Sequence, residues 1–565
     1  MTDNAPRNET QVAYHRRRLE ELKRIRQPWE RAWQPLAEYI EPTRLRLTMK
    51  NEGFTSRDKI IDSTGTFALR TLASGMHSGL TSPARPWFRL TTPDRELREF
   101  DPVKVYLSEV EKKMREVFQA SNIYTSFHTG YGDIGQFGQS CGLLAEDDKS
   151  VIRLNQQLHG RFWIARDENG VATTLYRQFR WSVERIVRFF GYEKCSERIR
   201  QAYDQSKYDQ TFDICHAVEP RLDRDTRKLN SANKAWLSNY WEYDGRENDS
   251  LLRESGFDEN PIIAPPWELA ADDTYAMSPG MIALGDVKML QLEQTRKLEG
   301  IDKKVRPPMT GPASMRNNPA SLLPGAITYV DATVANGGFR PAMEVRLELS
   351  ELREDIRDVQ DRIRQAFYAD LFLMLSNMEG IQPRNQFEIA ERKEEKLLAL
   401  GPVLENIYNG QLEPVIDRTF AILNRRNELP PPPPELENTE LEVEYISILA
   451  QAQKAVATGG VERVWAFAGN LAGLKPEALD KLDADQSIDV YADLIGVDPS
   501  IIVSDDKVKE VRAARAEQMQ AAQNAEMAAT MAPAAKAGMD AAATAAELAS
   551  LPAGGQLLGR LGISG

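Results

Sequence analysis

Residues whose types and spacing could support catalysis are sparse in this chain. The densest glycine segment, Gly130 to Gly138, lacks the lysine and the following helix that a phosphate-binding loop needs, and we interpret it as a turn-rich entry to a β region. The metalloprotease pattern HExxH, the hydrolase pattern GxSxG and the protein kinase motifs do not occur. The sequence therefore predicts a protein that is not an enzyme.

The histidines and cysteines show no metal-ligand spacing. The histidines are scattered, and we expect structural roles for all of them: His15, His77, His128, His159 and His216. Cys215 and His216 are neighbours, but a nucleophile and its base must meet in space, so adjacency is no evidence for catalysis. None of the cysteines forms a CxxC pair, so we expect small buried residues in a reducing compartment: Cys141, Cys195 and Cys215. The sequence predicts no metal and no cofactor.

Composition predicts a soluble chain of two or more domains that repels nucleic acid. The chain has 565 residues, of which 42% are hydrophobic and 27% are charged, which is enough to build packed cores. Acidic residues outnumber basic ones by 84 to 71, whereas a sequence-specific DNA-binding protein usually has the opposite balance. A surface past which DNA slides would tolerate this charge. We expect neither a membrane span nor a secretory signal peptide.

The longest helical pattern runs from Met343 to about Met374 without glycine or proline. Its apolar residues follow steps of four and three, which is a heptad seam that faces another helix: Val345, Leu349, Leu352, Ile356, Val359 and Ile363. An unbroken helix of this length would measure about 50 Å. Periodicity alone favours a coiled-coil arm or one helix of a bundle, and the alternative is a helix that packs against copies of itself in a ring.

A second amphipathic helix is predicted upstream, from Leu284 to Ile301. The segment between the two helices is too rich in proline and glycine to be helical. Two long helices joined by a compact module of about 40 residues would form an arm with a knob at its tip.

The rest of the chain predicts an α+β body that is mainly helical. Helices are expected over Glu9–Ile40, broken or kinked at its two prolines and bearing a basic face, and over Thr64–Leu80 and Val103–Ser121. Between Gly135 and Tyr243 the period changes towards two, with short helices at Ser182–Phe190 and Cys195–Tyr203. The run Pro430–Pro434 indicates a spacer, and the chain from Val508 is helical by propensity.

Several segments, in one order along the chain, resemble the portal or head-to-tail connector proteins of short-tailed bacteriophages. They cover roughly Trp29 to Pro434 and include LASGMHSGLTSPARPWFRL at Leu72–Leu90, Asp133–Asp147, PIIAPPW at Pro261–Trp267 and LALGPVLENIYNGQLEPVIDRTF at Leu398–Phe420. The chain departs from the family at residues 385–388, where it reads Asn-Gln-Phe-Glu and the family often has Thr-Ala-x-Glu.

The resemblance implies the fold of a portal-type ring subunit, usually present in twelve copies. By position, the wing would span residues 1–285, with its further helices at 385–434. The stem helices would be 286–301 and 343–371, and the clip between them 302–342. Residues 372–384 would form a channel loop, and 435–565 the crown with the Ala-rich C-terminal region.

The resemblance also implies three groups of functional residues. The stem would pack through the heptad seam named above. The channel loop would face DNA through Asn377, Met378, Glu379, Arg384 and Asn385, although an ordinary solvated loop is an equal alternative. The clip would contact partner proteins through Arg306, Arg316, Asn317 and Asn318.

The function implied is a channel at one capsid vertex through which double-stranded DNA is packaged, retained and ejected. Its partners would be further copies of the chain, non-specifically bound DNA, the major capsid and scaffolding proteins, the large terminase subunit and the tail adaptor proteins. The protein would be made in the host cytoplasm and reside in the virion. The alternatives are the packaging ATPase and nuclease itself, which would need the missing phosphate loop, and a non-viral coiled-coil scaffold.

Overall fold

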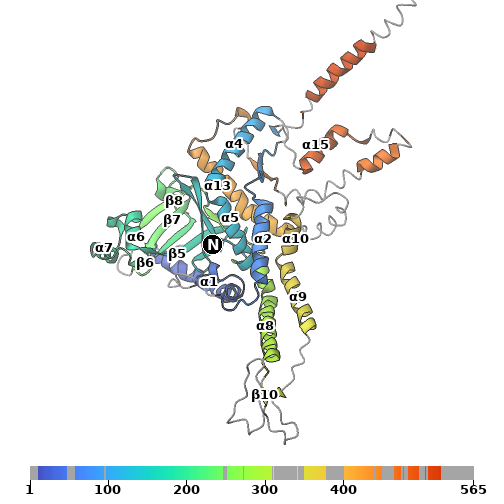
Figure 1. Cartoon of the computed structure of the whole chain (residues 1–565). Helices are drawn as coiled ribbons and strands as arrows, with labels where there is room; N and C mark the ends of the chain where they lie inside the picture. The colour runs from blue at the N-terminus through green and yellow to red at the C-terminus, as the bar shows by residue number, and fades with distance from the viewer. Residues whose placement is uncertain are drawn as a thin grey trace, which may run out of the picture. The chain divides into compact units, whose positions relative to one another are not determined.

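The structure is a computed structural model of the whole chain (Figure 1). It forms two compact units, Met1–Arg463 and Val464–Gly565, which are described separately. The residues that the structure describes are 10–47, 57–94, 97–98, 100–228, 230–245, 251–270, 273–307, 309–310, 340–341, 349–376, 400–436, 441–447, 449, 464–472, 475, 477, 481–495, 503 and 507–523.

The described part of the first unit has the mainly helical α+β fold that the sequence predicts. Its helices are α1 (Gln11–Tyr39), α2 (Thr64–Leu80), α4 (Asp101–Ala120), α5 (Ile123–Phe137), α6 (Val183–Phe190), α7 (Glu197–Asp204), α8 (Pro279–Val305), α9 (Leu349–Ala366), α10 (Ala369–Ser376), α12 (Gly401–Ile407) and α13 (Glu413–Arg425), with a π-helical turn at Tyr408–Leu412 between the last two. Its strands are β1 (Phe88–Thr91), β2 (Gly142–Asp147), β3 (Val151–Gln156), β4 (Phe162–Arg166), β5 (Ala172–Ser182), β6 (Thr211–Pro220), β7 (Trp236–Glu242), β8 (Arg253–Phe257), β9 (Ile262–Ile263), β10 (Met309–Thr310), β11 (Arg340–Pro341) and β12 (Glu442–Tyr445).

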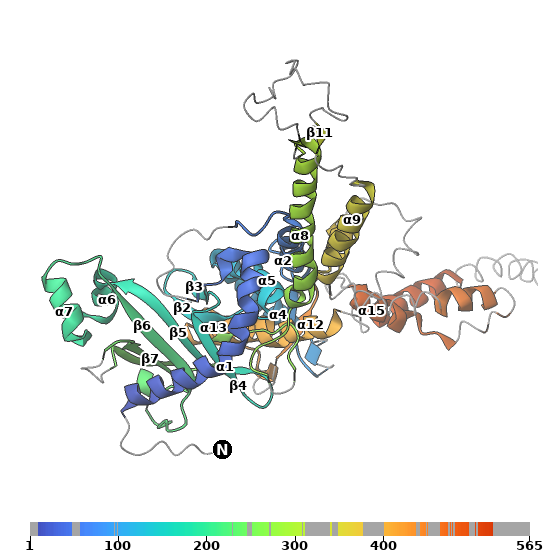
Figure 2. The same cartoon turned by 90° about the horizontal axis from the view of Figure 1, so that it is seen from below.

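A five-stranded antiparallel sheet in the order β4-β5-β6-β7-β8 forms the largest β region (Figures 1 and 2). Side chains alternate between its two faces along β6, as the period of two predicts. Cys215 and Ala217 pack in one cluster with Leu19 of α1, whereas Phe212 and Ile214 pack in another with α6 and α7. The sheet is therefore covered by α1 on one face and by the two short helices on the other.

Helix α1 continues through Pro28 and Pro35, so of the predicted break or kink the break does not occur. Each proline removes one backbone donor, but Trp33 and Leu36 are fully buried, and this packing offsets the loss. The basic face of α1 also has a structural role. The buried Arg26 donates to the carbonyls of Phe162 and Gly160 and pairs with Glu30.

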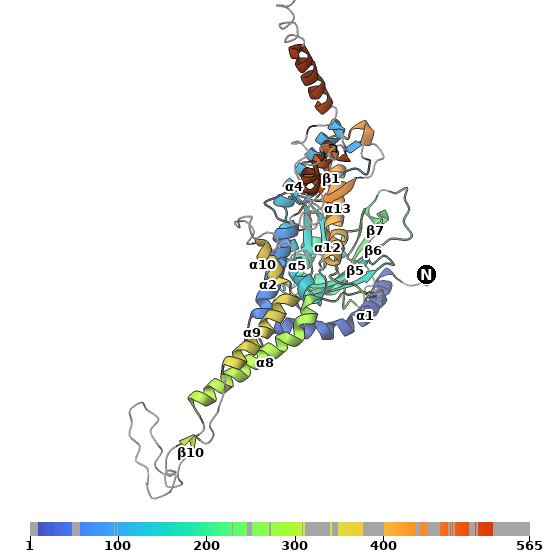
Figure 3. The ribbon, with the colours of Figure 1, turned by 90° about the vertical axis from the view of Figure 1, so that its right-hand side faces the viewer.

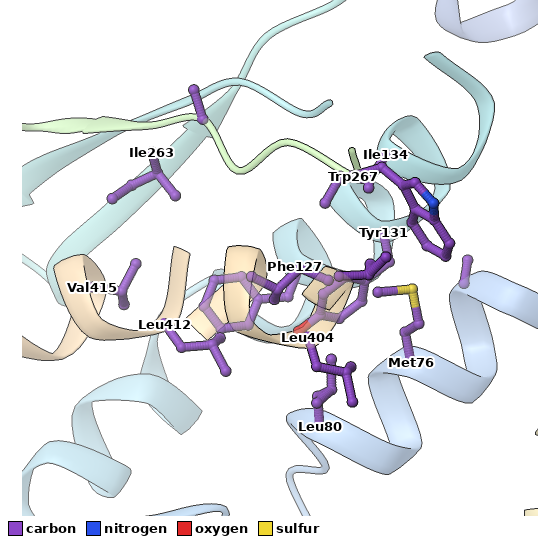
Figure 4. Packing of buried hydrophobic residues seen from close by; sticks show 14 of the residues in the cluster. Met76, Leu80, Phe127, Tyr131, Ile134, Ile263, Trp267, Leu404, Leu412 and Val415 are labelled. Atoms are coloured by element: carbon purple, nitrogen blue, oxygen red, sulfur yellow. The ribbon is translucent and has the colours of Figure 1, made fainter. Parts of the chain in front are cut away.

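The glycine segment 130–138 is the second half of α5, not the predicted turn-rich entry. The reason is close packing of α5 against α2, because a Cβ atom at Gly135 would lie 2.3 Å from Leu72 Cδ2. Only Gly138 needs its conformational freedom, since it ends the helix with a φ of 89°. Figure 4 shows the core around this contact, where Met76 of α2 and Tyr131 of α5 meet Leu404 of α12.

The predicted long helix is divided in two. Helix α9 ends at Ala366, and α10 starts at Ala369 after Tyr368, which has a left-handed φ of 53°. The break is stabilised by packing: Phe367 is buried, and Phe372 of α10 lies so close to α2 that a Cβ atom at Gly75 would be 2.2 Å from its ring. Residues 343–348 of the predicted helix lie outside the described residues.

The chain that follows the proline run still belongs to the first unit, which ends at Arg463. Strand β12 pairs antiparallel with β1, with Phe88 opposite Tyr445. In the second unit, α15 (Ala484–Ile495) is described together with helical residues at 464–472 and 507–523. Arg512 forms two hydrogen bonds to Asp485, at 2.6 and 2.7 Å. The predicted helical propensity from residue 508 is confirmed as far as residue 523.

A buried polar network joins α1 to the large sheet. Tyr176 and Asn239 both pair with Ala217, so they stand on one face on either side of β6. Asn239 Nδ2 lies 3.0 Å from His15 Nε2, His15 Nδ1 lies 2.8 Å from the Tyr176 hydroxyl, and that hydroxyl donates to Glu219 at 3.3 Å. Burial lowers the pKa of His15 to about 4 and raises the pKa of Glu219 to about 7.

These two shifts have opposite effects on stability. Glu219 has a folded pKa above its ordinary value, so its favourable contribution is complete below about pH 4.5 and is lost as the pH rises through about 7. His15 has a folded pKa below its ordinary value, so its contribution is present above about pH 6.5 and is lost as the pH falls through about 4.

We expect Glu219→Gln to stabilise the large sheet at pH 8 by about 2 kcal/mol and to change little at pH 5, because only above pH 7 does the native side chain carry a buried charge. Hydrogen exchange of β5 to β7 at both pH values, with urea denaturation, measures the effect. Equal stabilisation at both pH values would contradict the assignment.

Candidate functional site: the paired helices α8 and α9

Helices α8 and α9 lie side by side in all three whole-chain views (Figures 1 to 3). The contact is apolar. Val287 and Leu290 of α8 are fully buried in one hydrophobic cluster, and three positions of the heptad seam are buried in the same cluster: Ile356, Val359 and Ile363. Leu352 is half-buried against it, the side chain of Leu349 is not described, and Val345 lies outside the described residues.

This burial corrects the expectation that the seam faces other copies of the chain. The described part of the seam is covered within the subunit, because α8 carries an apolar stripe with matching spacing. The simpler alternative, an arm in which two helices of one chain pair, holds for Ile356, Val359 and Ile363. A seam can be read from sequence, but the helix that covers it cannot.

A polar clamp centred on Asp62 holds both α8 and α9 at the start of α2. Its carboxylate accepts hydrogen bonds from Gln294 of α8 and Gln360 of α9, both at 2.9 Å, and from the backbone and hydroxyl of Thr64. Gln291 accepts from the backbone N–H groups of residues 61 and 62. Burial alone would raise the pKa of Asp62, but these hydrogen bonds outweigh it and hold the pKa below its ordinary value.

Charged groups at the edge of the pair modulate the contact. Arg362 of α9 pairs with Asp286 of α8 at 3.2 Å, with both side chains partly exposed. Burial, followed by the nearby carboxylate of Asp355, raises the pKa of Glu293 on α8, and Arg362 opposes this shift. The interface therefore joins an ion pair to a like-charged pair, so apolar burial and not charge must provide most of its stability.

A second apolar stripe runs along a solvent-exposed side of α8, and at its edge Met289 Sδ accepts from Arg362 of α9 at 4.0 Å. Its members are exposed: Ile282 by 64%, Met289 by 40% and Leu292 by 50%. Spacings of seven and three residues place them on one side of the helix, and nothing lies within 4 Å of the Cβ position of Gly285 between them. We call these three residues the outer stripe. Sequence analysis missed it, although apolar residues on two sides of a helix indicate two partners.

The remaining predicted site residues are mostly outside the described residues. Arg306 is the C-cap of α8, and its backbone N–H donates to the backbone carbonyl of Asp302 at 2.6 Å. The other clip residues, Arg316, Asn317 and Asn318, are not described, and neither are the channel-loop residues Asn377, Met378, Glu379, Arg384 and Asn385. Strands β10 and β11 pair antiparallel, which brings the two ends of the predicted clip together.

Two further observations concern the described residues alone. Within them, no helix is long and apolar enough to cross a membrane. They also contain no group of three or more His, Cys, Asp and Glu side chains that could hold a metal ion.

His15, His159 and His216 are buried, whereas the structure brings His77 and His128 together on adjacent helices, which their positions in the sequence do not predict.

Residues 13–503 match the family described as bacteriophage head to tail connecting protein. The chain belongs to this family. It is 45% identical over 506 residues to the probable portal protein of Bordetella phage BPP-1. The aligned residues cover 89% of this chain and 91% of that protein. The chain is 43% identical over 510 residues to the portal protein of Salmonella phage epsilon15, covering 90% and 91%. The predicted resemblance to portal proteins and the predicted portal function are therefore both confirmed.

The chain is also similar to solved structures of phage-like particles. The neck of an empty gene transfer agent particle is 12% identical, covers 80% of this chain and 96% of its own, and has a TM-score of 0.34. The assignment to the family rests on the sequence matches.

We expect Asp62→Asn to weaken the attachment of α8 and α9 by about 1–2 kcal/mol. The amide has the same shape, but in either orientation its NH2 group faces donors, those of Gln294 and Gln360 or those of Thr64. Urea denaturation and hydrogen exchange in α8 and α9 measure the effect. Asp58→Asn, at an exposed carboxylate four residues earlier, is the matched control, and equal behaviour of the two variants would contradict the clamp.

Proposed function

We propose that the chain assembles as a closed ring at one capsid vertex and forms the channel through which double-stranded DNA enters and leaves. The outer stripe of α8 is the observation that carries the proposal. In the single chain, Ile282, Met289 and Leu292 expose apolar surface along a helix whose other side is already packed. Exposed apolar surface with this regular spacing favours a contact with another copy.

Charge supports passage of DNA without adhesion. Each chain has a formal net charge of −13. Twelve copies, the number usual in the family, would carry on the order of −150, and such a ring repels phosphates. The outer surface of α9 is charged with both signs, since Glu351, Arg353, Glu354 and Arg357 are all exposed. Passage of this kind needs no recognition of bases.

The proposed architecture follows the order of segments along the chain. The stem is the pair α8 and α9, and the clip is the segment closed by β10 and β11. The clip, through Arg306, Arg316, Asn317 and Asn318, would bind the large terminase subunit during packaging and the tail adaptor proteins afterwards. The loop after α10, through Asn377, Met378, Glu379, Arg384 and Asn385, would face the DNA. Capsid and scaffolding proteins would contact the wing.

The packaging ATPase remains the alternative, and the comparisons do not favour it. Both curated relatives are named portal protein, and the sequence has no phosphate-binding loop. We therefore propose that the chain is a structural conduit and that ATP hydrolysis belongs to a partner.

We expect Leu292→Glu and Ile282→Glu each to reduce assembly to monomers that keep their fold, because a buried charge at a subunit contact is costly whereas an exposed one is not. Light scattering gives the mass, and circular dichroism checks the fold. Leu222→Glu is the matched control, since Leu222 is 95% exposed in a turn of the wing. Rings that persist in both α8 variants would exclude the outer stripe as the contact.

Electron microscopy of the purified chain tests the function itself. We expect rings with a central hole and no DNA-stimulated ATP hydrolysis. Compact monomers that hydrolyse ATP in response to DNA would favour the packaging enzyme instead.

A further inference from the structure

His77 and His128 form an accessible pair on the neighbouring helices α2 and α5. Their ring centroids are 5.7 Å apart and their planes are nearly perpendicular, at 89°. His128 is exposed and His77 is half-buried, whereas the other three histidines of the chain are buried. The pair is therefore the one place where imidazole nitrogens are open to a ligand from solution.

The separation of the rings suits a shared metal ion. Two imidazoles that bind one tetrahedral Zn²⁺ through nitrogens about 2.1 Å from the metal have centroids roughly 5.2 Å apart. The observed 5.7 Å differs by a few tenths of an ångström, which side-chain rotation on an exposed face accommodates.

The opposite nitrogens are already held. His128 Nε2 lies 3.3 Å from the Ser74 hydroxyl, and His77 Nδ1 lies 3.5 Å from the Thr81 hydroxyl. Thr81 is itself fixed, because it is fully buried and bonds the Tyr131 hydroxyl at 3.1 Å. Metal-binding histidines usually donate their second N–H to such a partner, which fixes the tautomer and directs the other nitrogen to the metal.

We propose that His77 Nε2 and His128 Nδ1 bind one Zn²⁺ ion, with water at the remaining positions, and that the ion joins α2 to α5. Because α2 also packs against α10 through Gly75, the ion would strengthen the helix that holds the start of the channel loop.

Isothermal titration of the full-length, untagged chain with ZnCl2 at pH 7.5 tests the site. We expect one Zn²⁺ per chain, a higher melting temperature in its presence, and visible absorption when Co²⁺ replaces it. His77→Ala and His128→Ala should each abolish saturable binding. Ser74→Ala should weaken it about tenfold, since the support of one ligand is lost.

Thr125→Ala is the matched control, because Thr125 is exposed on α5 one turn before His128. It should bind Zn²⁺ as the unaltered chain does. Failure of the unaltered chain to bind one ion, or binding retained in both histidine variants, would overturn the proposal. Circular dichroism of each variant separates loss of the site from loss of the fold, and Ser74→Ala leaves both imidazoles in place.

Discussion

Burial of the α9 seam against α8 is the interaction on which the rest of the arrangement depends. Ile356, Val359 and Ile363 are fully or almost fully buried, and each contributes about 1.5–3 kcal/mol. The partly exposed pair of Arg362 and Asp286 adds at most about 1 kcal/mol. Apolar burial therefore holds the helices together, whereas the glutamines that meet Asp62 define how the pair is attached to α2.

The spacing of apolar residues along the sequence predicted much of the fold. It failed where contacts between residues far apart in the chain determine the local structure. The period of two located the β region between Gly135 and Tyr243, where β2 to β7 lie, and the short helices α6 and α7 within it were also predicted. The break at Tyr368 was missed because the apolar period continues across it, and only the contact of Phe372 with α2 explains it. Gly135 of α5 was misread for a similar reason, since Leu72 of another helix leaves no room for a Cβ atom there.

The candidate site shows the same limit. Spacing identified Ile356, Val359 and Ile363 as packing positions but could not tell which chain covers them. The outer stripe was hidden because its residues alternate with those of the inner stripe along α8. His77 and His128 gave no signal, since they belong to different helices and only the packing of α2 on α5 brings them within 5.7 Å.

Symmetry constrains what can cover the outer stripe. If the stripe of one copy met the stripe of a second, the contact would be the same patch on both partners, and it would close as a dimer. A ring needs two different surfaces on each copy. The exposed face of α9 cannot be the second surface, because it presents Glu351, Arg353, Glu354 and Arg357, and burying apolar side chains against them would desolvate charge. A ring built through α8 therefore requires a separate apolar patch on the neighbouring copy.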